Sequence, residues 1–374
     1  MSSLALGTFA VGTDAFVVAG FLPAMSTDLD VSVAVAGQSV TVFAVAYAVL
    51  SPVLASLTAT FPRRPLLVLA LGVLALANLG SALAPTFALL MATRIVAAAG
   101  AAAYTPNAGA VAAALVPLAK RGRALAVVVS GLTIATALGV PLGTVAARGM
   151  GWRLALAVVA LLSAAIAVLL RVLLPRLDGG APVPLRARFA VLRNPTVRTL
   201  LPVTILGMTA AYTAYAYAVP AFASVGIPAD GSPWILFAYG VGAVIGAQTS
   251  GRLADRYGGT RILITGYAVM ACGLAAFGSL SASSLVIPAL VAVLALVWGA
   301  SSWCQSPPLQ LRLMDAAPEQ ASLVIAFNAS SIYIGIGTGT AIGGLAGAAN
   351  VPAMFFTGAA IAVVTGAWVL ATRD

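Results

Sequence analysis

Residues 152–174 read WRLALAVVALLSAAIAVLLRVLL, a run whose charges, Arg153 and Arg171, stand only near its two ends. A helix rises 1.5 Å per residue, so about 20 apolar residues cross the roughly 30 Å hydrocarbon core of a bilayer. This stretch is therefore long and apolar enough to form a membrane-spanning helix.

Similar apolar runs fill the rest of the chain. Hydrophobic residues make up 61% of the 374 residues and charged residues only 7%, whereas an ordinary soluble domain carries about 25% charged residues. Twelve spans leave about 31 residues for each span and its loop, so no soluble domain fits. The sequence predicts an all-α membrane protein with twelve transmembrane helices, near residues 4–25, 35–57, 65–84, 87–116, 124–147, 152–174, 198–222, 233–254, 260–280, 284–308, 320–346 and 352–371.

The composition also excludes several classes of function. The chain has no histidine, so neither a HExxH zinc site nor a Ser-His-Asp triad can form. Its single lysine, Lys120, stands in the sequence AKRG, which is not a phosphate-binding GxxxxGK[ST] loop. We therefore expect neither an enzyme, nor a metal site, nor a bound cofactor. The net charge of +10, which suggests nucleic acid binding in a soluble protein, is explained here by membrane topology.

The basic residues predict an orientation. If both termini are cytoplasmic, 16 of the 19 Lys and Arg residues fall in cytoplasmic loops and their flanks. Arg148 and Arg153 then lie outside, and Arg94 lies within a span. The positive-inside rule thus favours an even number of spans with both termini in the cytoplasm.

The chain divides into two similar halves. The stretch from Pro175 to Pro195, rich in Pro, Gly and Arg, is the only clear linker. A shift of 196 residues places GVPLG at 139–143 on GIGTG at 335–339, although a chance match of Gly-rich sequence is the alternative. We expect two pseudo-symmetric six-helix bundles, over 1–174 and 198–374, joined by a cytoplasmic linker over 175–197, with their symmetry axis along the membrane normal.

These features resemble the major facilitator superfamily, in its twelve-span bacterial drug:proton antiporter group, over essentially the whole chain. The most specific element is GRLADRYG at 251–258, which is similar to the family's loop motif after span 8. The copy after span 2 is degenerate, because Ala59 stands where the motif has Asp. The family's gating and motif positions then fall on Arg63, Arg64, Gly251, Asp255 and Arg256.

Two further spans carry the resemblance. GTDAF at 12–16 and GFLP at 20–23 are similar to the first-span signature of sugar and drug exporters, several of which carry the acid one residue later. Arg94 fits the family's buried arginine of span 4. The antiporter motif of span 5 is matched by Gly131, Gly139, Pro141 and Gly143.

Asp14 is the only acid within a predicted span, and Arg94 is its expected partner. A bare charge at mid-bilayer costs about 2.5–3.5 kcal/mol, so Asp14 should face a partner or a cavity. Counted along their helices, both residues lie roughly 10–13 Å below the same end. Burial disfavours an ionised carboxylate and a neighbouring cation favours it, so Asp14 can bind and release a proton. A purely structural ion pair is the alternative.

Span 5 and the loop after span 8 are expected to control opening. The small residues of span 5 let helices touch closely, and we interpret them as a seam between the halves, with ordinary packing as the alternative. The resemblance implies that Asp255 latches the inner gate at the positive N-terminal end of span 5, near Ala124. A solvated loop charge is the alternative for Asp255.

Polar and aromatic side chains within the spans predict a substrate cavity. Apolar walls with a few polar contacts suit a neutral or weakly basic, largely aromatic molecule. Each of these residues can equally serve in packing. The candidates are Gln38, Tyr104, Asn107, Met208, Tyr212, Tyr215, Trp298, Ser302, Gln305, Asn328 and Tyr333.

Three functions remain open at this stage. The favoured one is a proton-coupled secondary transporter, driven by the proton gradient, that exports a small drug-like molecule or metabolite by alternating access. A facilitator or proton symporter that imports a sugar or nucleoside is the second, and a membrane sensor that binds without transport is the third. The resemblance implies a monomer in the bacterial inner membrane, whose partners are protons, its substrate and the lipid bilayer.

Overall fold

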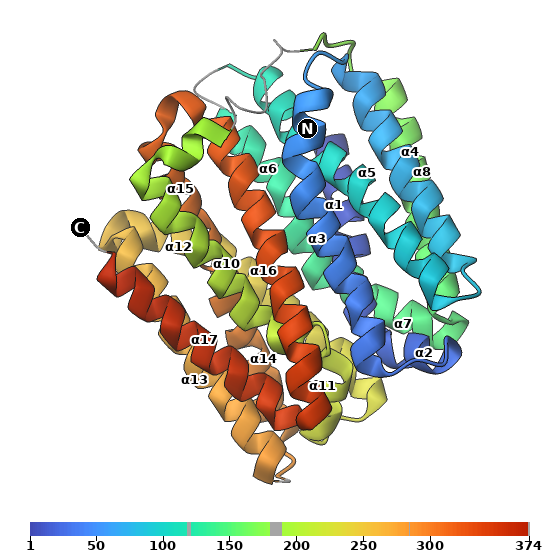
Figure 1. Ribbon diagram of the computed structural model, residues 1–374, viewed down its shortest axis with the longest axis vertical. Coiled ribbons are helices and arrows are strands. Elements are labelled where there is room, and N and C mark those ends of the chain that lie inside the picture. Colours follow the sequence, from blue (N-terminus) through green and yellow to red (C-terminus); the bar gives the residue numbers. More distant parts are fainter. Residues whose placement is uncertain (118–120, 180–188, 284, 373–374) are drawn as a thin grey trace.

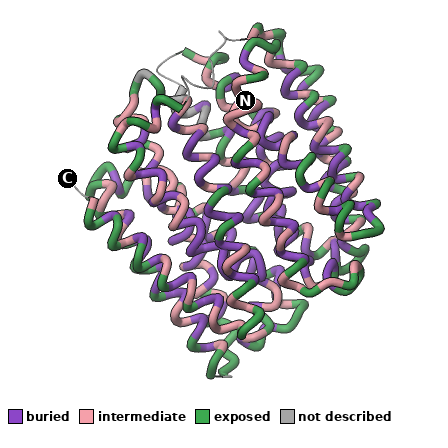
Figure 2. Tube along the Cα trace, viewed as in Figure 1, coloured by how far each residue is buried: buried purple, intermediate pink, exposed green. Residues whose placement is uncertain are grey.

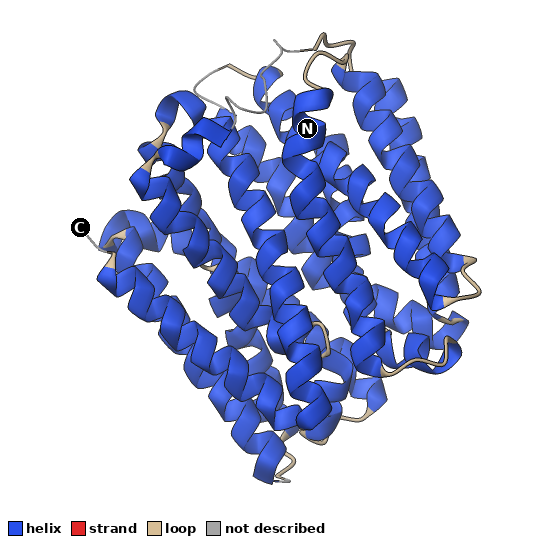
Figure 3. Cartoon of the chain, in the orientation of Figure 1, coloured by secondary structure: helices blue, strands red, loops and turns tan. Residues whose placement is uncertain are grey.

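A computed structural model describes residues 1–117, 121–179, 189–283 and 285–372. Within these ranges the chain forms helices and no strands (Figure 3). The chain begins and ends on the same side of the helix bundle, which we call the N-terminal side (Figure 1). The other side, where α1 ends, is called the opposite side.

The first half contains the following elements: α1 (Ser2–Val17), the 3₁₀ turn η1 (Val18–Gly20), α2 (Leu22–Asp28), α3 (Val33–Leu57), α4 (Arg63–Ala82), α5 (Phe87–Ala114), α6 (Arg121–Ile134), the π-helical turn η3 (Ala135–Gly139), α7 (Val140–Met150) and α8 (Trp152–Leu173).

The second half contains the 3₁₀ turn η4 (Ala190–Arg193), α10 (Pro195–Tyr215), α11 (Ala218–Ser224), the 3₁₀ turn η5 (Ala229–Gly231), α12 (Ser232–Tyr257), α13 (Gly259–Ser283), α14 (Pro288–Trp303), α15 (Ser306–Ala316), the 3₁₀ turn η6 (Pro318–Gln320), α16 (Ala321–Ala349) and α17 (Val351–Ala371).

Each predicted span coincides with a helix or a pair of consecutive helices. Ten helical segments of the described chain are long and apolar enough to cross a membrane, and α10 with α11 makes an eleventh if the bent pair is one span. The remaining predicted span, 233–254, is α12, which has 26 residues but carries polar and charged residues toward its end. The protein is therefore an all-α, multi-pass membrane protein.

Three predicted spans are not continuous helices, which corrects the sequence-based bounds: 4–25, 198–222 and 284–308, the last of which is interrupted between α14 and α15. The chain bends by 60° between α10 and α11. Pro220, in the first turn of α11, has no N–H to donate to the carbonyl of Ala216, which weakens the helix there and favours the bend. The first span likewise stops at η1, just before Pro23, and α2 turns away from it.

Burial follows the arrangement expected for a helix bundle in lipid. Buried residues run through the middle of the bundle, and exposed residues line its outer helices (Figure 2). Large apolar side chains are among the most exposed, for example Leu161 at 71%, Val172 at 72% and Leu345 at 78%. Such a surface is stable only where hydrocarbon replaces water.

The glycines of span 5 face α1, which corrects their interpretation as the seam between the halves. A Cβ atom at Gly131 would lie 2.3 Å from the carbonyl oxygen of Ala5, and one at Gly139 would lie 2.3 Å from Thr13 Oγ1. A Cβ atom at Gly143 would likewise meet Val17 of α1. The N–H of Val140 donates to Ala135 O, which forms the π-helical turn just before Pro141. These contacts fix the position of the helix that carries Asp14.

The halves meet through other residues. A Cβ atom at Gly240 of α12 would lie 2.3 Å from the Cα atom of Ala137 in η3, so these backbones touch. Along a second line of contact, α3 packs against α16. There Tyr217, at the bend of span 7, donates from its hydroxyl to Thr340 O at 3.1 Å and fills the space beside Gly37. The halves are thus closely packed at and beyond mid-height, toward the opposite side.

We predict that Gly131→Ala destabilises the protein while Gly72→Ala does not. The methyl group at 131 would overlap the backbone of α1, and overpacking typically costs about 1–3 kcal/mol. A Cβ atom at Gly72 meets nothing within 4 Å, and Ala is favoured over Gly in a helix by about 0.5–1 kcal/mol. Thermal unfolding of both variants in the same detergent tests this, and equal shifts would contradict the described contact.

Candidate functional site

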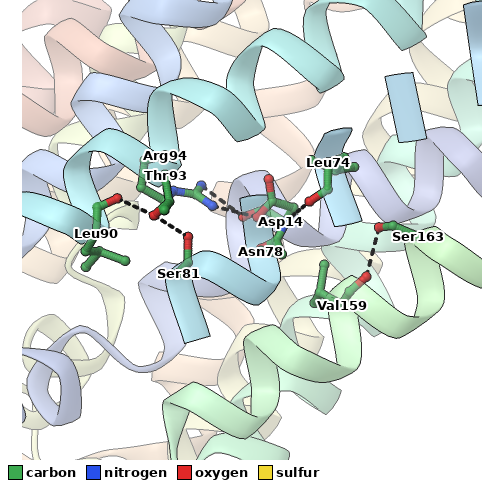
Figure 4. Close-up of polar contacts among 9 residues, drawn as sticks. All are labelled: Asp14, Leu74, Asn78, Ser81, Leu90, Thr93, Arg94, Val159 and Ser163. Atoms are coloured by element: carbon green, nitrogen blue, oxygen red, sulfur yellow. Dashed lines mark hydrogen bonds and ion pairs between the residues drawn. The ribbon is translucent and has the colours of Figure 1, made fainter. Parts of the chain in front are cut away.

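Asp14 and Arg94 form an ion pair in the interior of the first half. Arg94 Nη1 donates to Asp14 Oδ1 at 2.6 Å, and Nη2 donates to the backbone carbonyl of Asp14 at 3.3 Å (Figure 4). Both side chains are fully buried. Among the side chains that the structure describes, they are the only charged ones that are buried. The structure therefore brings together the two residues whose depths agree in the sequence.

The pair keeps hydrogen-bonding capacity that no protein group uses. Asp14 Oδ2 and Arg94 Nε are both buried without a hydrogen-bond partner. A buried polar group without a partner costs about 1–3 kcal/mol, and more when it is charged. Asp14 Oδ2 is thus a free acceptor beside a permanently charged cation.

Two aromatic contacts connect this pair to the second half. The Arg94 guanidinium carbon lies 4.4 Å from the centre of the Phe43 ring, whose own centre lies 6.1 Å from that of Tyr333 on α16. Phe16, two residues after Asp14, lies 6.2 Å from Tyr212 on α10. Arg94 is therefore one aromatic ring away from the other half, and the helix that carries Asp14 contacts that half through Phe16.

An aromatic cluster fills the second half beside these contacts. We define it as Tyr212 and Tyr215 of α10, Tyr239 of α12 and Trp298 of α14. Ring centres of contacting members lie 4.5 to 6.1 Å apart, and all four side chains are buried. Three of the predicted cavity residues, Tyr212, Tyr215 and Trp298, are thus neighbours, and Tyr239 joins them.

The other predicted cavity residues of the second half make contacts of their own, and one of them touches the cluster. Ser302 donates to Trp298 O at 2.7 Å. Gln305 Oε1 accepts from Tyr267 at 2.7 Å, and Asn328 Oδ1 accepts from Thr204 at 2.7 Å, so both amide oxygens are engaged within this half. Met208 packs against Gly335 of α16, and Tyr333 stacks on Tyr47 of α3 with ring centres 3.7 Å apart.

Three predicted cavity residues lie apart from the cluster. Tyr104 donates to Leu4 O at 3.0 Å, between α5 and α1. Asn107 Oδ1 accepts from Arg63 Nη1 at 2.8 Å, near the start of α4. Gln38 lies beside Gly344, at the contact between α3 and α16. The first two hold helices of the first half together.

The loop motifs lie on the N-terminal side. Arg63 also donates to Ala59 O at 3.0 Å, and Arg64 donates to Arg171 O. Gly251 lies 3.7 Å, measured from its ideal Cβ position, from Pro307 Cβ. The last turn of α12 carries Asp255, which is exposed, and Arg256, which lies over the Tyr257 ring. The expected partner of Asp255 is the start of α6, where the side chains at 121–123 lie outside the described residues.

Sequence reasoning missed the aromatic residues that link the two halves. Phe16, Phe43 and Tyr47 lie in the first half and Trp303 in the second. Tyr239, which packs within the second half, was also missed. Phe43 and Tyr47 are four residues apart and so share a helix face, a signal available in the sequence. The partners of that face became visible only in three dimensions.

Comparison with known proteins gives consistent matches. The family model of the Major Facilitator Superfamily matches residues 4–226 and 203–374. The inner membrane transport protein YdhP of Escherichia coli (strain K12) is 33% identical over 91% of this chain and 87% of its own length. A chloramphenicol resistance protein of Streptomyces lividans is 32% identical over 90% of this chain and 86% of its own length.

A solved structure shares the fold. The crystal structure of a D-xylose-proton symporter superposes with a TM-score of 0.81, covering 98% of this chain and 95% of that chain. The sequence identity of 16% makes this a likeness of fold alone.

Proposed function

The chain belongs to the major facilitator superfamily of membrane transporters, and from this premise we propose that it exports a small organic molecule in exchange for protons. Asp14 is the proton carrier, and Arg94 is the fixed charge that competes with the proton for the carboxylate. The observation that supports this assignment is the fully buried ion pair with its free carboxylate oxygen. An arginine cannot realistically deprotonate, so only Asp14 changes charge.

The aromatic contacts support coupling between proton and substrate. Protonation of Asp14 weakens its bond to Arg94, and a released guanidinium changes its contact with Phe43. Phe43 contacts Tyr333, and Phe16 contacts Tyr212, a member of the aromatic cluster. The charge state of one residue can thereby bias the packing between halves, which is the two-state element that coupled transport needs.

The proposed movement is a rocking of two bundles, residues 1–174 and 198–374, about the line between them. Contacts of α3 with α16, and of Gly240 with η3, support a form closed toward the opposite side. We propose that the N-terminal side is cytoplasmic, that Asp255 latches it, and that the protein works as a monomer in the bacterial inner membrane. The excess of arginine in the loops of that side supports the orientation.

Export is tested by expression in a drug-sensitive bacterium that lacks its main efflux pumps. We expect resistance to at least one compound of an antibiotic panel that includes chloramphenicol, together with lower cellular accumulation of that compound. One named relative, the chloramphenicol resistance protein, supports including this drug. Higher accumulation of a labelled sugar or nucleoside, without resistance, would instead indicate an importer. Binding without any flux would indicate a sensor.

A further inference from the structure

We propose that the aromatic cluster binds an uncharged molecule with a flat ring and at least two hydrogen-bond acceptors, such as carbonyl, nitro or ring-nitrogen groups. This inference rests on the proposed transport function, because it names the substrate class of that transporter. It also narrows the expectation from the sequence, which left weakly basic molecules open.

The aromatic cluster contains buried hydrogen-bond donors without partners. The hydroxyls of Tyr212 and Tyr215 and the indole Nε1 of Trp298 have no hydrogen-bond partner. All three side chains are at most 2% exposed. Buried side-chain polar groups are nearly always paired, so three unpaired ones in contacting rings require an explanation. A bound molecule with acceptor groups would satisfy these donors, and a transporter needs a site that binds its substrate in this way.

The packing of the rings in the cluster suits a flat guest. Tyr212 and Tyr215 lie 5.0 Å apart at 61°, and Tyr215 and Trp298 lie 6.1 Å apart at 77°. These two pairs of rings meet edge to face, so a flat guest that separated them would contact ring faces as well as polar tips. An indole N–H can only donate, so at least this position demands an acceptor from the ligand.

Within the described chain, the surroundings of the cluster offer no free counter-charge to a charged ligand. A bound cation would gain cation–π attraction from the rings, but it would find no free carboxylate, because the one buried carboxylate that the structure describes is held by Arg94 at 2.6 Å. While Asp14 is ionised, a bound anion meets the same neutralised pair. A charged molecule would therefore enter a water-poor site without a free counter-charge, which is strongly unfavourable. An uncharged molecule has no such penalty.

The experiment compares two ring probes on the purified full-length protein in nanodiscs by titration calorimetry. 4-Nitroacetophenone is uncharged with acceptors at both ends, and phenyltrimethylammonium is a cation. We expect 4-nitroacetophenone to bind at least tenfold more tightly. Each of Tyr212→Phe and Tyr215→Phe should weaken it about two- to tenfold, the effect of losing one hydrogen bond. Tighter binding of the cation, or equal affinity in all three proteins, overturns the proposal.

Thermal stability without ligand provides an independent readout. Tyr212→Phe and Tyr215→Phe remove a hydroxyl that has no partner, so the melting temperature should stay unchanged or rise. Tyr217→Phe is the matched control: its hydroxyl donates to Thr340 O, so stability should fall while probe affinity stays within about twofold. A fall in melting temperature for Tyr212→Phe equal to that of the control contradicts the absence of a partner.

Transport and binding measurements together distinguish a wrong substrate class from a wrong transport mechanism. Proton-driven transport of a cationic dye, with no binding of 4-nitroacetophenone, would overturn the substrate class and leave the transporter intact. Suppose instead that probe binding depends on the Tyr212 and Tyr215 hydroxyls, but transport does not respond to the pH gradient. That result would support the substrate class and reject proton coupling.

Discussion

Asp14→Asn should reduce transport driven by a pH gradient to the level of protein-free vesicles. Asparagine keeps the shape and the acceptor that Arg94 contacts at 2.6 Å, but it cannot bind a proton at physiological pH. Exchange of substrate against substrate, which needs no net proton movement, should persist. Uptake into proteoliposomes with and without an imposed pH gradient measures both activities.

The matched control for Asp14→Asn is Asp230→Asn. Asp230 is exposed and pairs with Arg148 at 3.2 Å on the opposite side, so its loss should leave pH-driven transport nearly unchanged. Because Asp14→Asn leaves Arg94 less well compensated, Asp14→Asn/Arg94→Gln serves as a second variant in which both side chains are neutral. Gradient-driven uptake at the wild-type level in either variant of Asp14 would reject its role.

Arg94→Leu should destabilise the fold strongly, by about 3–5 kcal/mol, the usual effect of removing one partner of a buried pair. Asp14 would remain fully buried without its counter-charge, and the Phe43 ring would lose the guanidinium packed on it. A large drop in melting temperature in detergent checks this prediction.

The double variant separates charge from packing in that experiment. Asp14→Asn/Arg94→Leu carries no buried charge, so it should recover most of the stability that Arg94→Leu loses. An equal melting temperature for the single and double variants would mean that the ion pair does not contribute as described, and that packing on Phe43 dominates.

The fold was largely predictable because most spans can be recognised in the sequence as long runs of apolar residues. What the sequence could not give is where a span breaks. Pro23 and Pro220 both lie within predicted spans, yet the straight helix stops before each of them. Neither proline has the N–H that would bond to a carbonyl of the preceding turn. Proline is often tolerated within membrane helices, so its presence alone does not decide between a kink and a break.

The candidate site was predictable only in part, for a related reason. Depth along a helix follows from residue counting, so the meeting of Asp14 and Arg94 could be foreseen. The direction in which a helix faces does not follow in the same way. The glycines of span 5 pack on α1 rather than on the second half, and Tyr104 is bonded to α1 rather than free to line a cavity. In a helix that is apolar all round, no polar face indicates which neighbour it meets.

The central claim is that a proton crosses the membrane through Asp14 when the substrate crosses the other way. It is tested most directly by a pH-sensitive dye inside proteoliposomes, to which a compound identified by the resistance panel is added without an imposed gradient. The account predicts a substrate-induced pH change for the wild type and Asp230→Asn, and none for Asp14→Asn or Asp14→Asn/Arg94→Gln. A pH change of the same size in the Asp14 variants, or none in the transporting wild type, would contradict it.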